Sequence, residues 1–303
     1  MLQKPNSDKT KMKADLHFHP SHFDEPHITE WKIPTIKDIF KKAFKKNINL
    51  LTITSCSDYV TRDKRWKKLE KEYDHTFSLG IFCDGMLQSL EINPNMYMLN
   101  FSQDMHPTPE DILYYKLIIT HGQEIVTDKG DINVLFAEKY IDLKPSEREF
   151  PKADFKYALN SAKDSGENVV ITIPHPTWRN SLSEKELKEL FEEGKIDALE
   201  TFDSLLPQKY NTSAKNLAKK INIPGIAVSD GHRISDLGKS YIHFRHIGYN
   251  GLKDYYDNLA KGIKEAMRKE EFVTYEQSCP NISRGLYVLR GTEARLESRF
   301  SKP

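Results

Sequence analysis

Short apolar runs recur along the chain, and most of them end in a polar residue before a stretch with helical spacing begins. Seven runs predict β-strands, over residues 14–18, 48–54, 116–125, 131–137, 168–173, 196–202 and 224–229. Amphipathic helices are predicted between several of these runs, over residues 35–46, 153–166, 183–194 and 211–220. Strands that alternate with helices are typical of parallel pairing. The pattern therefore predicts an α/β fold.

One long stretch interrupts this alternation. Residues 59–115 contain a basic helical segment and further apolar runs, and we interpret them as an insertion after the second strand, a cap or side hairpin. Residues 1–12 are a polar tail, and residues 251–303 begin with a helix that we expect to pack on the core. Residues 13–250, insertion included, are expected to form one domain, since a chain of 303 residues can bury a single large core.

Composition and charge narrow the classes of function. The 45 Lys and Arg residues balance the 44 Asp and Glu residues, so any contact with nucleic acid must come from a local patch. The three cysteines, Cys56, Cys83 and Cys279, are too few and scattered for a disulfide framework, which favours a reducing, cytoplasmic setting. The N-terminal tail lacks the apolar core of a signal peptide, and no apolar run approaches the roughly 20 residues that a membrane helix needs.

The first predicted strand carries an alternating pattern of polar residues. In KADLHFHP, Asp15, His17 and His19 occupy every second position, so in a strand they share one face. Leu16 and Phe18 then lie on the opposite face. Two imidazoles on one face could be satisfied by hydrogen bonds or by solvent, but imidazole is also the commonest metal ligand. The strand alone leaves both interpretations open.

Further polar residues stand where the later strands end. Glu124 ends the third strand, His175 follows the fifth in IPHP, and Glu200 lies on the sixth. The sequence SDGH supplies Asp230 and His232 after the seventh. Because the active sites of parallel barrels lie at the carboxyl ends of the strands, we expect these side chains to meet. Imidazoles and carboxylates in such number favour a multinuclear site for zinc, manganese or iron.

Five motifs, ADLHFHP, HGQEI, IPHP, DALETF and VSDGH, resemble in order and spacing those of the polymerase and histidinol phosphatase (PHP) family. A sixth pattern, N-x-x-A-x-x-L-A over residues 211–218, lies between the last two. The resemblance extends over about residues 13–244. It implies a distorted seven-stranded (β/α) barrel and a metal-dependent phosphoesterase.

The resemblance also implies a set of metal ligands from the ends of several strands: His17, His19, Asp24, Glu124, His175, Asp230 and His232. The two histidines of the first strand, with Glu124 and Asp230, resemble the ligands of the family's first ion. Glu124 would bridge to a second ion, which His175 also binds. The remaining two residues would belong to a third ion.

Two positions depart from the family pattern. The second strand usually ends in Thr-Asp-His, where this chain has Ser55 and Cys56 after the threonine. On the fourth strand a ligand histidine is expected near Asp131 or Asn133, and neither is histidine. Cys56 could coordinate as a thiolate and Asp131 as a carboxylate, or each substitution could lose an ion. We therefore expect one or two divalent ions, and three if both replacements coordinate.

Three functions are compatible with these features. The first is hydrolysis of a phosphate ester, with nucleotides or short oligonucleotides favoured, by water activated at the metals. Arg179 and Arg233 follow two ligand loops and could bind phosphate through their guanidinium groups, or could be surface residues. The second function is a degenerate domain that binds metal or a phosphorylated ligand without efficient catalysis. The third is hydrolysis of an amide or lactone. The sequence does not indicate an oligomeric state.

Overall fold

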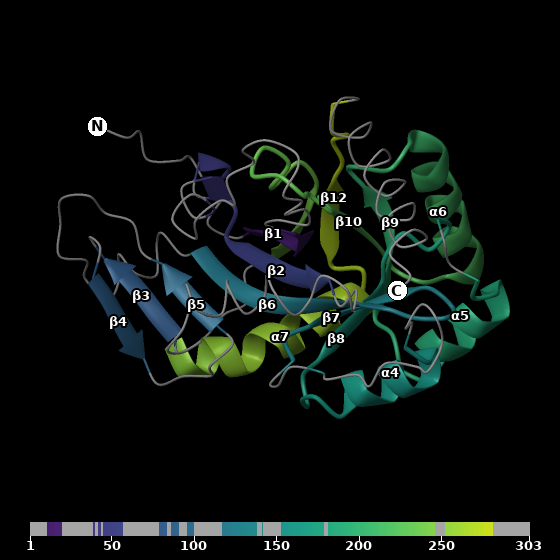
Figure 1. Cartoon of the computed structure of the whole chain (residues 1–303), viewed down its shortest axis with the longest axis horizontal. Helices are drawn as coiled ribbons and strands as arrows, with labels where there is room; N and C mark the ends of the chain where they lie inside the picture. Colours follow the sequence, from purple (N-terminus) through teal and green to yellow (C-terminus); the bar gives the residue numbers. More distant parts are fainter. Residues whose placement is uncertain are drawn as a thin grey trace, which may run out of the picture.

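The computed structural model describes twelve parts of the chain, and every structural statement below refers to them. They are residues 11–19, 39, 42–43, 45–56, 79–83, 86–90, 96–99, 117–137, 141, 153–178, 181–245 and 252–280, of which 39 and 141 are single residues. Strands form a long curved sheet, and helices cover part of its outer side (Figure 1). Both of the predicted element types are present, so the fold is mixed α/β.

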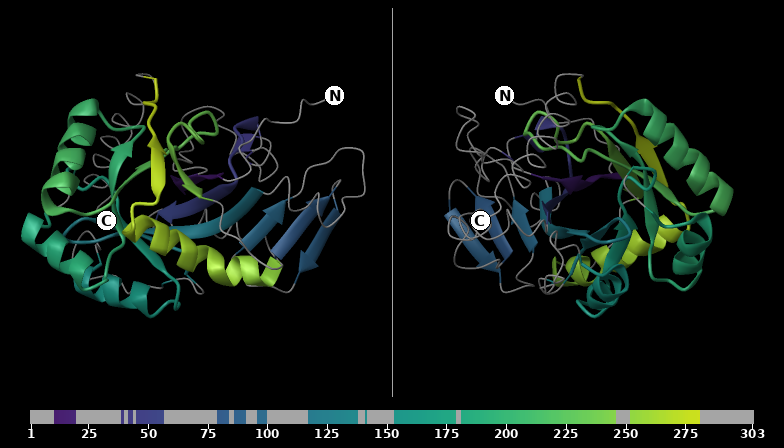
Figure 2. Two further views of the ribbon diagram at one scale, coloured as in Figure 1. Left: turned by 180° about the vertical axis from the view of Figure 1, so that it is seen from behind. Right: turned by 45° about the vertical axis from the view of Figure 1, so that its right-hand side comes forward.

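Nine strands form the path of the main sheet, in the order β10-β9-β8-β7-β6-β2-β1-β11-β12. Their bounds are Lys11–Phe18 for β1, Leu50–Cys56 for β2, Leu117–Val126 for β6, Asp131–Leu135 for β7, Val170–Ile173 for β8, Ala198–Asp203 for β9, Gly225–Val228 for β10, Tyr241–Arg245 for β11 and Phe272–Tyr275 for β12. A bridge between Phe18 and Gly231 brings the end of β1 to the residues after β10. The sheet therefore curves into a nearly closed barrel (Figure 2).

Each of the seven predicted apolar runs contains a strand, but the predicted number of strands in the barrel is not confirmed, because β11 and β12 extend the path to nine. Parallel pairing is present between β1 and β2, β2 and β6, β8 and β9, and β9 and β10. The prediction is wrong for β7, which runs antiparallel to both β6 and β8. Residues 127–130 alone join β6 to β7, and such a short connection cannot cross over to a parallel strand.

Three more strands come from the predicted insertion: β3 Leu79–Cys83, β4 Met86–Leu90 and β5 Met96–Leu99. β5 pairs antiparallel with residues 117–120 of β6, next to the part of β6 that pairs with β7. The other residues of 59–115 lie outside the described chain. The described part extends the sheet sideways, and a cap over one end of the barrel is not confirmed.

Several ends of the predicted helices have recognisable caps. The helices are α4 Phe155–Lys163, α5 Glu184–Glu192, α6 Gln208–Ile221 and α7 Leu252–Arg268. The Asp154 side chain accepts from the Tyr157 N–H at the start of α4, and Ser183 and Glu186 form a capping box at the start of α5. Asn222, in the left-handed conformation, ends α6. In the predicted helix over 35–46, the described residues Ile39, Lys42, Ala43 and Lys45 are helical.

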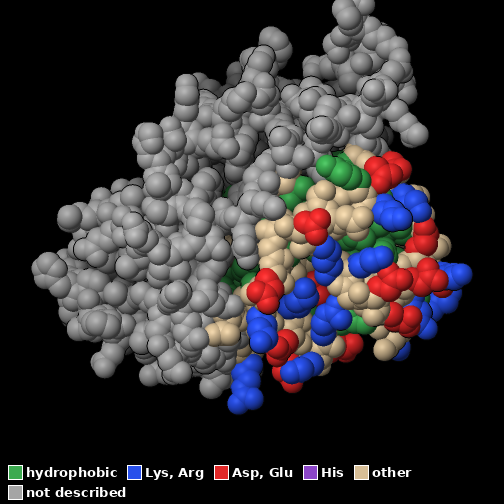
Figure 3. All heavy atoms as spheres, turned by 90° about the horizontal axis from the view of Figure 1, so that it is seen from below, with side chains coloured by type: hydrophobic (Ala, Val, Ile, Leu, Met, Phe, Trp, Pro, Cys, Tyr) green, Lys and Arg blue, Asp and Glu red, His purple; other side chains and the backbone are tan. Residues whose placement is uncertain are grey.

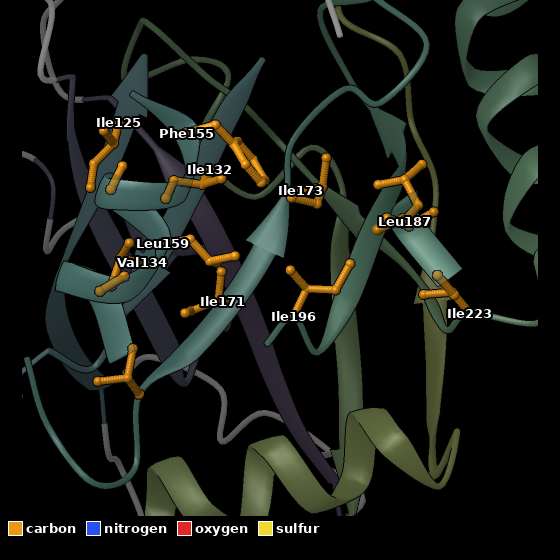
Figure 4. Close-up of a cluster of buried hydrophobic side chains, with 14 of the residues drawn as sticks. Ile125, Ile132, Val134, Phe155, Leu159, Ile171, Ile173, Leu187, Ile196 and Ile223 are labelled. Atoms are coloured by element: carbon orange, nitrogen blue, oxygen red, sulfur yellow. The ribbon is translucent and has the colours of Figure 1, made fainter. Parts of the chain in front are cut away.

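Two apolar clusters hold the helices to the sheet. In one, Ile171 and Ile173 of β8 and Val134 of β7 pack against Leu159 of α4 (Figure 4). In the other, α7 contributes Leu259, Ala260, Ile263 and Met267 to a cluster with residues of β1 and β10. Each fully buried aliphatic side chain of this size contributes about 1.5–3 kcal/mol, so the clusters fix the strand ends from which the polar residues project. Among the described helices, none is long and apolar enough to span a membrane.

Candidate metal centre

The two histidines of β1 turn their rings in a defined direction. The Nδ1 atom of His17 lies 3.0 Å from Glu200 Oε1, and the Nδ1 atom of His19 lies 2.8 Å from the carbonyl oxygen of Thr54. An acceptor at Nδ1 fixes a proton on that nitrogen and leaves Nε2 for coordination. The two Nε2 atoms face each other at 2.9 Å.

His175 and His232 have the same arrangement. The Nδ1 atom of His175 lies 3.3 Å from the carbonyl oxygen of Trp178, and that of His232 lies 2.7 Å from the carbonyl oxygen of Asp230. His175 and Asp230 both have positive φ, of 33° and 44°. Residues other than glycine adopt this backbone conformation uncommonly. The two residues follow the ends of β8 and β10, where the chain turns to aim their side chains.

Two carboxylates lie among the imidazoles. Glu124 Oε2 is 3.3 Å from His19 Nε2, and Glu124 Oε1 is 3.2 Å from His175 Nε2, so its two oxygens face different histidines. Asp230 Oδ1 is 3.4 Å from the Nε2 atoms of both His17 and His19. A carboxylate with oxygens directed to two groups of donors is suited to bridging two ions. These two carboxylates and the three histidines that they contact, His17, His19 and His175, are all buried.

These separations fit a cation at the centre of the donors. Two ligands of a tetrahedral zinc ion with bonds of 2.0–2.1 Å lie roughly 3.3 Å apart. The contacts of Asp230 with both histidines, and of Glu124 with His19, are 3.3–3.4 Å. The distance between His17 and His19 would need to open by only a few tenths of an ångström. The donor set therefore fits a divalent metal.

The surroundings of the two histidines of β1 shift their pKa values in opposite directions. Burial opposes the charge on His17, but the Glu200 carboxylate beside it raises the pKa of His17 to about 9. Burial lowers the pKa of His19, and the charge of His17 adds to this effect. His17 is the more basic ring, which favours His17 as the donor in the 2.9 Å contact between the two Nε2 atoms, and a cation would replace that proton.

A second group of donors consists of Glu124, Asp131 and His175. Burial disfavours the charged form of His175, but its hydrogen bond with Glu124 and the charge of Asp131 raise the pKa of His175 to about 10. Asp131 Oδ2 lies 3.8 Å from His175 Nε2. Because β7 is antiparallel, its first residue pairs with Val126 at the end of β6, and so reaches the end of the barrel where Glu124 lies.

Asn133, the other position at which a histidine was expected, does not join either group of donors. Its Nδ2 atom donates to Glu200 Oε1 at 2.7 Å and lies 2.9 Å from His17 Nδ1. The amide therefore belongs to the shell that orients His17. Of the two alternatives on this strand, the structure brings Asp131 to the metal donors.

Two buried carboxylates of β9 were missed or left without a role by the sequence analysis. Glu200 supports the ring of His17, and Asp203 is buried beside Asp230. Burial raises the pKa of Asp203 to about 6. The pKa of Asp230 is raised well above its usual value by burial and by the charge of Asp203. Asp203 is the last residue of β9, so the strand-end rule used for the other residues would have identified it.

Three of the predicted positions fall on parts of the chain that the structure does not describe, and a fourth, Arg233, is described. Asp24 and Arg179 lie outside the described residues, as does the side chain of Cys56. Arg233 is half-buried, one residue beyond His232, and its charge opposes the rise that burial causes in the pKa of Asp236. Its role in binding phosphate stays a prediction.

The described surface that faces the viewer in Figure 3 mixes acidic and basic side chains. Ion pairs such as Lys129 with Glu186 and Lys220 with Glu184, at 2.6 and 2.7 Å, join charges of opposite sign around α5. On the described part of this face, no patch of basic residues forms a track for a polyanion.

Comparisons with known proteins gave one family match and several similar structures. The family model described as PHP-associated matches residues 208–263. The structure of PsfC from Pseudomonas syringae is similar, with 14% identity and a TM-score of 0.55 over 94% of this chain and 98% of that one. At this identity, the similarity shows a shared fold. A search of curated proteins gave no match.

Two other structures are more distant. A lesion-specific endonuclease, EndoQ, from Pyrococcus furiosus has 15% identity and a TM-score of 0.45, over 86% of this chain and 56% of that one. A protein from Bifidobacterium adolescentis, described as a metal-dependent phosphoesterase, has 13% identity and a TM-score of 0.37, over 82% and 94%. At these TM-scores we base no argument on either structure.

The matched segment contains the loop after β10, and with it Asp230 and His232. The histidines of β1 meet this loop, and the motifs that resemble the PHP family lie on both. The match therefore supports the resemblance to the PHP family over residues 208–263.

Proposed function

We propose that the protein is a metal-dependent hydrolase of phosphate esters. The observation that carries this proposal is the convergence of buried imidazoles and carboxylates in three overlapping groups, whose ligand atoms lie within 4.8 Å of one another in each group. When bound, divalent metals supply Lewis acidity and lower the pKa of water to about 7. Such a centre is suited to hydrolysis, whereas a histidine cluster that only stabilises a fold does not need shared carboxylates.

Two ions would be held by the described residues. The first would bind to His17, His19 and Asp230, and the second to Asp131 and His175, with Glu124 between them. His19 presents a single Nε2 atom, so it can serve only one ion. His232, which is grouped with His19 and Asp230, would complete the first site, or would serve a third ion with ligands from outside the described residues.

The substrate in this proposal is a small phosphorylated molecule, with nucleotides and short oligonucleotides favoured. Arg233 would bind a phosphate oxygen beside the metals, and Arg179 is proposed for the same role from its position after His175.

A second candidate function is a domain that binds metal without efficient catalysis. Asn133 favours it, because an amide stands where the family has a ligand histidine, and its nitrogen is engaged by Glu200. The two candidates differ in turnover and not in metal binding, so both measurements are needed.

The experiment compares wild type with Glu124→Gln, which keeps the shape of the side chain but removes its charge. Glu192→Gln, on the exposed face of α5, is the control. We expect zinc, manganese or iron after purification without chelators, and hydrolysis of one of four substrate types: mononucleotides, bisphosphates, short oligonucleotides or aryl phosphates. Glu124→Gln should lose at least one ion and reduce hydrolysis by several orders of magnitude, with an unchanged circular dichroism spectrum.

The outcomes separate the candidates. Bound metal without hydrolysis of any of these substrates would establish the second candidate. Absence of bound metal, with none taken up on titration, would contradict both. Activity that survives Glu124→Gln intact would show that the metal ligands are assigned wrongly.

A further inference from the structure

Asp15, the first polar residue of the alternating pattern in β1, does not join the metal donors. Its carboxylate is fully buried. Oδ1 accepts a hydrogen bond from the Ser229 N–H at 3.1 Å, and Oδ2 accepts one from the Gly238 N–H at 2.8 Å. The register between β1 and β2 shifts after Asp15, so the simple alternation of faces expected for this strand is interrupted. One carboxylate thus holds both ends of the loop over residues 229–238.

The same loop is tied to β1 at its beginning. The Ser229 hydroxyl donates to the carbonyl oxygen of His17 at 3.1 Å, and accepts from the Gly231 N–H at 3.2 Å. The His19 N–H donates to the carbonyl oxygen of Gly231 at 2.9 Å. A Cβ atom on Gly231 would lie 3.1 Å from Phe18 Cδ2, so the loop backbone packs directly on β1.

This loop carries two proposed ligands. Asp230 Oδ1 lies 3.4 Å from the Nε2 atoms of His17 and His19, and the rings of His19 and His232 are 4.8 Å apart. Metal sites tolerate deviations of only about 0.2 Å in ligand distance. A small shift of the loop relative to β1 would therefore disturb the donor set.

We propose that Asp15 is a positioning residue, which fixes the loop over residues 229–238 against β1 and so sets the separation between the histidines of β1 and the ligands Asp230 and His232. This inference rests on the proposed metal centre. It adds a residue that contacts no metal and no substrate. Two backbone N–H groups that are nine residues apart converge on its two oxygens, and a neutral side chain cannot accept both in the same way.

The test is Asp15→Asn, which keeps the shape of the side chain. Its one oxygen can accept from Ser229 or from Gly238, and its amide group then faces the other N–H. Asp197→Asn is the matched control, because Asp197 is equally buried and accepts from the Ile171 N–H at 2.9 Å and from Arg268 Nε at 3.0 Å. It precedes the first residue of β9, and its contacts are with β8 and α7 instead of the loop.

Two measurements are made on each variant. Hydrogen exchange of the metal-free protein should show amides of the loop exchanging about tenfold faster or more in Asp15→Asn, the scale of a lost charged hydrogen bond. Zinc affinity, from competition with a chromophoric chelator, should fall about 10- to 100-fold in Asp15→Asn, as for the loss of other outer-shell partners. Asp197→Asn should leave both loop exchange and zinc affinity at the wild-type values.

Double variants identify which ion is affected. The loss of zinc binding free energy in the double variant Asp15→Asn/His232→Ala should be smaller than the sum of the losses in the two single variants, because both substitutions act on the loop. In the double variant Asp15→Asn/Asp131→Asn, the loss of zinc binding free energy should equal the sum of the two single losses, because Asp131 belongs to the other group of donors. Full additivity with His232→Ala would overturn the proposal.

Other outcomes are equally decisive. Unchanged loop exchange in Asp15→Asn would show that Asp15 does not hold the loop, even if the metal centre is confirmed. Faster exchange with wild-type zinc affinity would show that the loop contact does not set the ligand geometry. A wild-type protein that binds none of zinc, manganese and iron would overturn the proposed function and the positioning role with it, while the exchange data would still report the loop contact. If Asp15→Asn does not fold, Ser229→Ala removes the hydroxyl of the same network, and wild-type zinc affinity in that variant would overturn the proposal.

Discussion

Replacing Glu200 with glutamine or with alanine separates the charge of this carboxylate from its hydrogen-bonding shape. Glu200 is buried, its Oε1 atom lies 3.0 Å from His17 Nδ1, and the same oxygen accepts from Asn133 Nδ2 at 2.7 Å. In Glu200→Gln, the remaining oxygen can still accept from both donors. In Glu200→Ala, both donors lose their acceptor.

The two substitutions therefore have different expected magnitudes. A hydrogen bond to a charged group contributes about 1.5–3 kcal/mol and a neutral one about 0.5–1.5 kcal/mol, so loss of the charge alone costs roughly 1–1.5 kcal/mol. This corresponds to about a tenfold loss of zinc affinity. Glu200→Ala should cost up to about 100-fold in affinity. It should also lower the free energy of unfolding of the metal-free protein by roughly 1–3 kcal/mol for each of the two unsatisfied donors.

Both quantities can be measured on the same samples. Zinc affinity is obtained by competition with a chromophoric chelator, and the free energy of unfolding by urea titration with a chelator present. Glu192→Gln, exposed on α5, is the control for the change of charge. Wild-type zinc affinity in both variants, or a larger loss in Glu200→Gln than in Glu200→Ala, would refute the argument that Glu200 orients His17.

Three further predictions address the substrate, the protons and the packing. Arg233→Ala should leave the melting temperature nearly unchanged but lower kcat/KM by about tenfold or more, the scale of one lost charged hydrogen bond, and a large loss of stability with unaltered kinetics would favour a structural role. Zinc binding at pH 7 should release protons, because the pKa values of His17 and His175 in the metal-free protein are raised to about 9 and about 10, above the ordinary value of 6.5, so both rings are protonated at pH 7. The release should diminish as the pH rises through 9 to 10, and calorimetry in buffers of different ionisation enthalpy measures it; a release that is constant with pH would contradict the assignment. Gly122→Ala should destabilise the protein by roughly 1–3 kcal/mol, because the new Cβ would lie 2.6 Å from Thr52 Cγ2 between central strands, and an unchanged urea midpoint would show that the neighbouring side chain yields without cost.

Local patterns in the sequence predict much of this centre. Alternation along β1 and the polar residues at strand ends identify His17, His19, Glu124, His175, Asp230 and His232, and the structure brings all six together. This works because the position of a side chain on a strand depends on nearest neighbours in the sequence. Whether these residues bind metal stays a prediction.

The parts that the sequence analysis missed depend on contacts between distant segments. The direction of β7 decides whether Asp131 or Asn133 reaches the donors, and only the short connection over residues 127–130 indicated that direction in the sequence. The partners of Asp15 lie more than 200 residues away, and its alternation with the two histidines in the sequence did not indicate them. No local pattern reports a contact at that separation.

The reversal of β7 also has a consequence for the order in which the protein folds. Glu124 and Asp131 belong to one antiparallel hairpin with a short turn, so they meet through a contact that costs little loop-closure entropy. His17 and Glu200 are 183 residues apart, and Asp15 and Gly238 are 223 residues apart, so these contacts require nearly the whole described chain. Contacts of such long range form late in folding. We therefore expect a nascent chain to carry a hairpin with two acidic residues long before it can hold an ion, and metal uptake to mark the last step, in which the end of β10 closes on β1.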